Sequence, residues 1–328
     1  MRKPVKQFEL GLRAASVAVA IAAGVLCGMP ASGDAQAQTT VRLFDGPPQG
    51  TWRPIANMIK RAIEEKLAGA NVSIEPGAGL SNVIAVEEGK GEIGMVASSA
   101  LFLGIDGKPP FKAATKNVRV LATLYPQLAY MMTFRNDIKS ITDLKGKRVS
   151  VTPKGYASEG VNQMILKTVG MSYNDIEEQF LGEVESGDAM RDGRLDALMA
   201  MGDLPYSIVV DLASTGKLRL INLAPDHIDR LRGINKGFFK FNVKGGTYQG
   251  IANDYSTFAV SIIMLANAKV PDATAKAITR ALVEVLPDLQ KNFLAFKVMT
   301  PRDMAQDTGI PFHPGAAAYF REAGLSGK

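Results

Sequence analysis

Short β-branched runs alternate with longer stretches of helical apolar spacing along most of this chain. Residues 41–44 form the first run, and the next stretch repeats apolar side chains every three or four positions, as one helix face does: Ile55, Met58, Ile59, Ala62, Ile63 and Leu67. Further strands are predicted at residues 72–75, 93–96, 149–151, 178–181, 196–201 and 218–222, and further helices begin at Asn82, Ser158 and Gly187. This order is typical of an α/β protein with mostly parallel sheets.

Two longer apolar segments, residues 118–133 and 256–265, are predicted to be strands that cross between two lobes, with Pro126 interrupting the first. Residues 233–251 contain turn glycines and are predicted to be mostly loop. Helical spacing returns at residues 275–286 and 289–298, and these helices are expected to rejoin the first lobe. The prediction is a two-lobed clamshell with a hinge. Residues 38–127 and 266–328 form lobe 1, and residues 128–265, including the return hinge strand, form lobe 2.

The chain passes twice from a strand through a glycine-containing turn into a helix. Gly155 lies in one turn, before a helix that Ser158 is expected to cap, and Gly50 lies in the other, before a helix capped by Thr51. The first backbone N–H groups of each helix lack partners and lie at the positive end of the helix dipole. Two lobes that each offer such a turn are suited to hold one small solute with a carboxylate.

Residues 1–37 have the composition of an export signal. A basic start is followed by an almost uncharged apolar stretch at residues 14–29 and by Ala35-Gln36-Ala37, which resembles a cleavage site. The apolar stretch is shorter than the ~20 residues that a spanning helix needs. We therefore expect a signal peptide over residues 1–37 and a soluble periplasmic protein that begins at Gln38.

Composition argues against several other classes of function. Removing residues 1–37 takes four basic and two acidic side chains from totals of 38 and 32, which leaves a net charge of +4 and no basic run interleaved with aromatics. Nucleic-acid binding is therefore not expected. Cys27 is the only cysteine and lies in the leader, so the mature chain has no disulfide or thiolate metal site. His227 and His313, the only histidines, are expected in exposed loops, and no paired carboxylates stand out, so we expect no catalysis, metal or cofactor.

Several short motifs follow one another along the whole mature chain. They are Gly50-Thr51-x-x-Pro54, Gly77 through Asn82, Leu144-Lys145-Gly146-Lys147-Arg148-Val149-Ser150-Val151, Gly155 with Ser158-Glu159, Asp196-Ala197 with Gly202 and Pro205, and Tyr248-x-Gly250. In this order they resemble the TAXI family of solute receptors for TRAP transporters. The resemblance implies a type II-like periplasmic-binding-protein fold. It also implies delivery of a small anionic solute, an organic acid or acidic amino acid, to a TRAP-type membrane permease. We expect the protein to be a monomer.

The resemblance carries binding positions onto Gln49, Gly50, Thr51, Asn82, Ser98, Gly155, Ser158, Gly202 and Pro205. The chain departs from the family pattern at both turns, where Trp52 and Arg53 replace the usual tyrosines and Tyr156 stands within the second turn. Trp52, Arg53, Lys154 and Tyr156 are therefore added to the candidate site. Ala97 and Ser99 also stand where the family has Gln and Asp. Because these polar groups are lost and three of the added side chains bring donors, a solute with more negative charge or fewer amines is expected.

Each candidate also has a purely structural interpretation. Trp52 either stacks on the solute or packs on the first lobe. Arg53 either clamps a carboxylate or is solvated at the helix start. Ser158 is expected to cap its helix whether or not it also binds the solute, and Asn82 is expected to present its amide in the first helical turn.

Two other functions stay open at this point. A periplasmic sensor that presents its closed form to a membrane histidine kinase has the same sequence features as a transport receptor. A hydrolase or transferase on a two-lobed α/β scaffold is the alternative from another class, and the lack of a catalytic constellation counts against it. The sequence does not separate transport from sensing.

Overall fold

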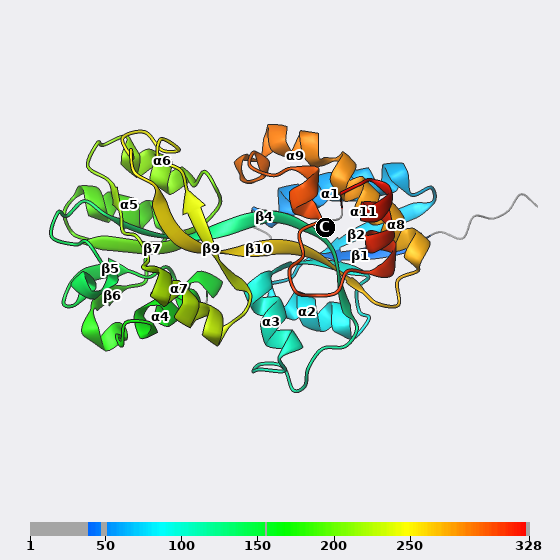
Figure 1. Cartoon of the computed structure of the whole chain (residues 1–328), viewed down its shortest axis with the longest axis horizontal. Coiled ribbons are helices and arrows are strands. Elements are labelled where there is room, and N and C mark those ends of the chain that lie inside the picture. Colours follow the sequence, from blue (N-terminus) through cyan, green and yellow to red (C-terminus); the bar gives the residue numbers. More distant parts are fainter. Residues whose placement is uncertain (1–38, 47–50, 155, 326–328) are drawn as a thin grey trace, which may run out of the picture. The chain divides into compact units, whose positions relative to one another are not determined.

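The computed structural model describes residues 39–46, 51–154 and 156–325, and within them ten strands join into one continuous sheet, drawn in Figure 1. The strand order is β2-β1-β3-β10-β4-β7-β5-β6, with β8 beside β4 and β9 beside β10. In chain order the strands are β1 Thr39–Phe44, β2 Ala70–Glu75, β3 Ile93–Ala97, β4 Val118–Thr133, β5 Arg148–Ser150, β6 Glu177–Gln179, β7 Ala197–Gly202, β8 Arg219–Leu220, β9 Phe238–Val243 and β10 Tyr255–Asn267. The helices are α1 Trp52–Lys66, α2 Leu80–Glu87, α3 Ser98–Ile105, α4 Ala157–Lys167, α5 Glu183–Arg191, α6 Ser207–Ala213, α7 Pro225–Ile234, α8 Asp272–Glu284, α9 Leu286–Asn292, α10 Pro301–Met304 and α11 Pro314–Glu322.

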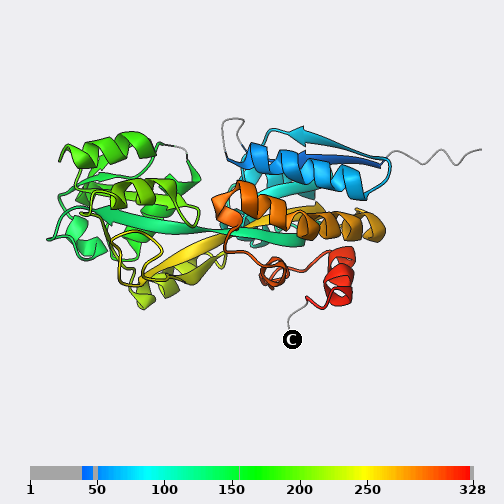
Figure 2. The same ribbon diagram turned by 90° about the horizontal axis from the view of Figure 1, so that it is seen from above.

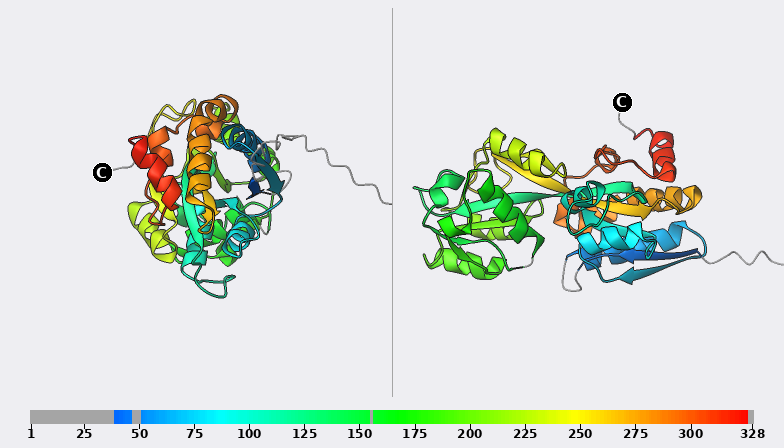
Figure 3. Two further views of the ribbon diagram at one scale, coloured as in Figure 1. Left: turned by 90° about the vertical axis from the view of Figure 1, so that its right-hand side faces the viewer. Right: turned by 90° about the horizontal axis from the view of Figure 1, so that it is seen from below.

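Parallel pairing holds each end of the sheet together. β1 is parallel to β2 and β3, and β5 is parallel to β6 and β7. The long strands β4 and β10 are antiparallel to each other and to the trio that each one borders. Figures 2 and 3 show these two strands running side by side between the trios. The α/β class and the two crossover strands are thus confirmed, although the strands form one sheet instead of two.

The first core lies on both faces of the β1 end of the sheet. Met95 and Ile262 face helices α1, α8, α9 and α11, whereas their chain neighbours Val96 and Ile263 face α2 and α3. This alternation follows from the two-residue period of a strand, which places successive side chains on opposite faces. Strand β3, which is covered on both faces, is apolar throughout, whereas β1 alternates, with Val41 and Leu43 buried on either side of Arg42.

The second core lies around the β5 end of the sheet. Met131 and Met199 pack with helices α4 and α7, and Met132 and Leu198 pack with α5 and α6 on the other face. On β4, Tyr125 belongs to the first core and Leu128 to the second. On β10, Val260 belongs to the second core and Ile262 to the first. The lobe boundaries at residues 127 and 265 remain predictions.

Several predicted elements differ from the structure. Residues 233–251, predicted to be mostly loop, contain strand β9 and the end of helix α7. The prediction omitted helices α3, α6, α7, α10 and α11. Pro126 does not interrupt β4. It lies opposite Ser261, whose N–H points away from β4 and donates to the Ser98 hydroxyl at 3.0 Å, as in a pair of antiparallel residues that exchange no backbone hydrogen bonds, so the N–H that proline lacks is not needed towards β10. Within the described ranges no helix combines the length and apolar character needed to cross a membrane.

Candidate functional site

The turn after β1 is built around an internal ion pair. Asp45 is fully buried, and Arg53 in the first turn of α1 places its Nε 2.6 Å from Oδ2 and its Nη2 3.1 Å from Oδ1 of that carboxylate. Burial raises the pKa of Asp45, and the Arg53 charge opposes the rise. The Arg53 guanidinium thus neutralises a carboxylate of the protein itself, through one hydrogen bond from Nη2 and a close ionic contact from Nε.

Asn82 supports this turn from behind. Its side chain is fully buried, and Nδ2 donates to the carbonyl oxygens of Asp45 at 2.6 Å and Met95 at 2.7 Å, while Oδ1 accepts from the Ala78 N–H at 3.1 Å. The amide hydrogens and oxygen are all used within the protein. Asn82 therefore joins the ends of β1 and β3.

Thr51 and Trp52 begin helix α1. Thr51 occupies the N-cap position, as predicted, but it is exposed and its side chain makes no capping hydrogen bond. Trp52 is half-buried and packs against the first core, and a Cβ placed on Gly46 would lie 3.3 Å from its ring. Trp52 thus packs on the first lobe, as one of its two interpretations predicts, and part of the side chain stays accessible to solvent. Gln49 and Gly50 lie outside the described residues, as does Gly155 of the second turn.

The turn after β5 contains a strained threonine. Thr152 is buried and has a φ of 67°, a left-handed conformation that β-branched residues rarely adopt. Its hydroxyl donates to the Val151 carbonyl at 2.6 Å and lies 2.9 Å from the Ser158 hydroxyl. The prediction that Ser158 caps α4 is wrong: the helix begins at Ala157, its N-cap residue is Tyr156, and the Ser158 hydroxyl bonds to Thr152 instead.

Lys154 and Tyr156 flank this second turn at the surface. The Lys154 ammonium lies 4.4 Å from the centre of the Phe180 ring, and the Tyr156 side chain is 62% exposed. Neither side chain is part of the core. Both positions are open to a solute that approaches the start of α4.

Gly202 and Pro205 lie where β7 ends. Gly202 is buried, and a Cβ there would come within 2.4 Å of the Tyr206 ring, so only glycine lets this ring cover the strand end. The segment is held by Tyr130, whose hydroxyl donates to the Asp203 carbonyl at 3.1 Å, and by Tyr248, whose hydroxyl accepts from the Tyr206 N–H at 2.9 Å. The turn is therefore fixed by buried tyrosines from other elements.

Ser98 performs a structural role that the motif did not indicate. It is 4% exposed, its hydroxyl donates to the Gly237 carbonyl at 2.6 Å, and it accepts from the Ser261 N–H at 3.0 Å. Nearby, the Asn235 amide donates to the Ser99 carbonyl at 2.8 Å. These bonds join the start of α3 to the segment that precedes β9.

The structure adds four polar residues that the sequence analysis missed, namely Tyr125, Gln127, Asp203 and Tyr206. Burial raises the pKa of the Tyr125 hydroxyl on β4, the Asp203 carboxylate raises it further, and Trp52 lowers it. Gln127 donates to the Asp203 carboxylate at 3.1 Å. The only signal in the sequence was a polar residue directly after an apolar strand, which also describes many ordinary turns.

The prediction that both histidines lie in exposed loops is wrong. His313 is fully buried and caps α11 through its Nδ1, and His227 lies within helix α7. Among the residues that the structure describes, no group of three or more His, Cys, Asp or Glu side chains is arranged to hold a metal ion.

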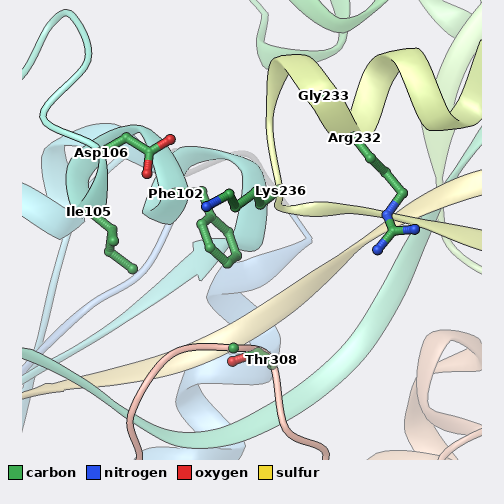
Figure 4. Close-up of a pocket in the computed structure, with 8 residues that line it drawn as sticks. Phe102, Ile105, Asp106, Arg232, Gly233, Lys236 and Thr308 are labelled. Atoms are coloured by element: carbon green, nitrogen blue, oxygen red, sulfur yellow. The ribbon is translucent and has the colours of Figure 1, made fainter.

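Two cavities lie away from the candidate residues. One, of about 540 Å³, is formed by α3, the end of α7 and the loop at Thr308, and Figure 4 shows Arg232, Lys236 and Asp106 around it. The other, of about 1170 Å³, lies between α10, the following loop and α11. Of the predicted site residues that the structure describes, none lines either cavity.

Comparison with known proteins identifies one family and a shared fold. A family model described as the NMT1-like family matches residues 45–324. A solved structure described as a periplasmic transporter is 16% identical, with a TM-score of 0.50 over 88% of this chain and 96% of that chain. This likeness shows the fold alone, and it confirms the predicted type II-like periplasmic-binding-protein architecture.

Two sulfonate-binding proteins are also similar to this chain. One is the putative sulfonate ABC transporter protein SsuA from Methylobacillus flagellatus KT, at 14% identity and a TM-score of 0.48 over 88% of both chains. The other is the alkanesulfonate-binding protein SsuA from Xanthomonas axonopodis pv. citri. It is 17% identical, with a TM-score of 0.44 over 88% of this chain and 84% of that chain.

Proposed function

The chain belongs to the NMT1-like family, and we propose that it is an extracytoplasmic solute-binding protein that delivers a small, carboxylate-bearing solute to a membrane permease. One observation carries the proposal. Turns that lead into helices follow the carboxyl ends of parallel strands β1 and β5, which belong to separate cores joined by β4 and β10. Ligands of open α/β sheets bind at such strand ends.

The start of α4 is the proposed carboxylate position. Helix α4 has 11 residues, and its N-cap residue Tyr156 contributes no side-chain hydrogen bond, so the first-turn N–H groups and the helix dipole are available to an anion. The buried, left-handed Thr152 positions the Ser158 hydroxyl beside this turn. The first turn has less positive charge to offer, because Arg53 is paired with Asp45.

We further propose that the protein is a TAXI-family receptor for a TRAP-type permease, and the motif resemblance supports this. The leader sequence supports a periplasmic location after cleavage before Gln38. N-terminal sequencing of the exported protein tests the location. A mature chain that retains residues 1–37 contradicts it.

A substitution at Ser158 tests the carboxylate site. Thermal unfolding in the presence of organic acids, amino acids and sulfonates identifies a solute, since a ligand at one hundred times its dissociation constant adds about 2.7 kcal/mol of stability. Ser158→Asp then places a negative charge in the first turn of α4, which favours the helix but repels a bound carboxylate. We expect calorimetry to show at least a tenfold loss of affinity in the folded variant.

The matched control is Asn174→Asp, which adds the same charge at an exposed position in the 3₁₀ segment Tyr173–Asp175. Its affinity for the solute should equal that of the wild type. Equal affinity in the Ser158→Asp variant as well would contradict the proposed site.

A further inference from the structure

Asp203 differs from Asp45 and Asp196, the two almost fully buried carboxylates among the described residues. Asp45 is paired with Arg53, and Asp196 accepts from Arg148 at 2.9 Å and 3.0 Å. Asp203 is half-buried, and across the described ranges no Lys, Arg or His nitrogen lies within 4.0 Å of its carboxylate. Within the same ranges, the side chain that bonds to this carboxylate is the neutral Gln127 amide at 3.1 Å.

Two buried hydroxyl groups without partners accompany this carboxylate. Tyr125 is fully buried and Tyr206 is 7% exposed, and neither hydroxyl has a hydrogen-bond partner within the part of the chain described. The Trp52 indole influences the pKa of the Tyr125 hydroxyl and the Glu183 carboxylate that of the Tyr206 hydroxyl, but neither makes a hydrogen bond to it. Buried polar groups are normally satisfied, and exceptions need an explanation.

The charge around these groups is negative. Burial raises the pKa of the Tyr206 hydroxyl, Glu183, the first residue of α5, and Asp203 raise it further, and Glu183 also raises the pKa of Asp203. Burial is the main cause of the raised Asp203 pKa. Removing an ionised carboxylate from water costs free energy when no cation lies beside it. Carboxylates with shifted pKa values of this kind cluster at functional sites.

We propose that Asp203 binds a protonated or N–H-bearing nitrogen of the solute, and that the hydroxyl groups of Tyr125 and Tyr206 complete its hydrogen bonds. This inference rests on the proposed function. It means that the solute has a nitrogen donor as well as a carboxylate. It departs from the expectation of fewer amines, because the structure pairs Arg53 internally and leaves Asp203 without a cation.

The geometry of the elements supports one shared contact. Tyr125 and Gln127 come from β4, whereas Asp203 and Tyr206 come from the turn after β7. The hydroxyl groups of Tyr130 and Tyr248 hold that turn by hydrogen bonds to its backbone. The four side chains therefore occupy a position that is set by buried strands rather than by mobile surface groups. A solute nitrogen placed there donates to the Asp203 carboxylate and to the hydroxyl oxygens of Tyr125 and Tyr206.

Paired compounds that differ in one nitrogen test the proposal. We expect L-aspartate to bind at least tenfold more tightly than succinate, or L-glutamate more tightly than glutarate, and Asp203→Asn to remove this difference. The asparagine oxygen still accepts from Gln127, so the variant keeps the turn intact. Equal affinity for both members of each pair, with no effect of Asp203→Asn, overturns the inference and leaves the solute-binding function standing.

The unliganded protein provides a second readout. Asp203→Asn removes an uncompensated charge and should raise the melting temperature by about 1–4 °C, as a stabilisation near 1 kcal/mol does in a protein of this size. The matched control is Asp196→Asn at the opposite end of β7, which breaks an ion pair and should lower it. If no compound binds, the proposed function fails, and the melting temperatures alone decide the inference: a decrease in both variants overturns it.

Discussion

The Ser98 hydroxyl donates to the Gly237 carbonyl oxygen at 2.6 Å, across 139 positions of sequence. The two backbones meet so closely that a Cβ on Gly237 would lie 2.5 Å from the Ser98 carbonyl carbon and the Ser99 nitrogen. Ser98 also accepts from Ser261 on β10. This contact connects α3, β10 and the segment before β9 at one point, where the first and second cores adjoin.

Gly237→Ala is expected to destabilise the protein. The added methyl group meets backbone atoms, which cannot rotate away, so we expect a loss of about 1–3 kcal/mol of unfolding free energy in chemical denaturation. Gly233→Ala is the control, because a Cβ at that position meets nothing within 4 Å. Equal stability of the two variants would show that the contact between Ser98 and Gly237 is loose in solution.

Thr152→Asn is expected to stabilise the protein. Asparagine adopts a left-handed backbone more readily than a β-branched residue, and its side chain retains a polar group for the Ser158 hydroxyl. Strain of this kind costs on the order of 1–3 kcal/mol, and we expect about 1 kcal/mol to be recovered in denaturant unfolding. A less stable variant would mean that the threonine hydroxyl contributes more than the strain costs.

Sequence patterns predicted the elements whose apolar residues recur on one face. Helix α1 is the clearest case, because Ile55, Ile59 and Ile63 are all buried on the side that faces the first core. Helix α3 was missed because its sequence is apolar almost all round, so no stripe marks it as a helix. Strand β9 was missed because flanking glycines suggested a loop, whereas pairing with β10 fixes it.

The candidate site was harder to predict than the fold. The sequence indicated both helix-starting turns but not that Asp45 neutralises Arg53, because that pair depends on how β1 meets α1 in space. It also gave no reason to single out Asp203, since its significance lies in a missing partner. Hydrogen-bond satisfaction is a property of the folded chain, and no local pattern encodes it.

Asp196 is expected to govern stability in acid. Hydrogen bonds from Arg148 lower the pKa of this carboxylate to about 2. A lowered folded-state pKa stabilises the protein above the unfolded-state value near 3.9, and this stabilisation is lost as the pH falls from about 4 to 2. In the Asp196→Asn variant, the decrease in unfolding free energy between pH 4 and 2 should be smaller by on the order of 1–2 kcal/mol, allowing for solvent screening. Unchanged pH dependence in the variant would assign the acid sensitivity to other carboxylates.

His313 is expected to make the protein less stable just below neutral pH. Burial lowers the pKa of this imidazole, and the Asp272 carboxylate, 3.6 Å from Nδ1, only partly opposes the effect, while Arg119 lowers the pKa further. The unfolded chain therefore takes up a proton near pH 6.5 that the folded chain resists, so stability falls as the pH decreases from about 6.5 towards 5. His313→Asn keeps a side chain that caps α11 well but removes the titration. Melting temperatures measured between pH 7.5 and 5 should decline less in this variant than in the wild type, and parallel curves would show that the buried imidazole is not the source of the decline.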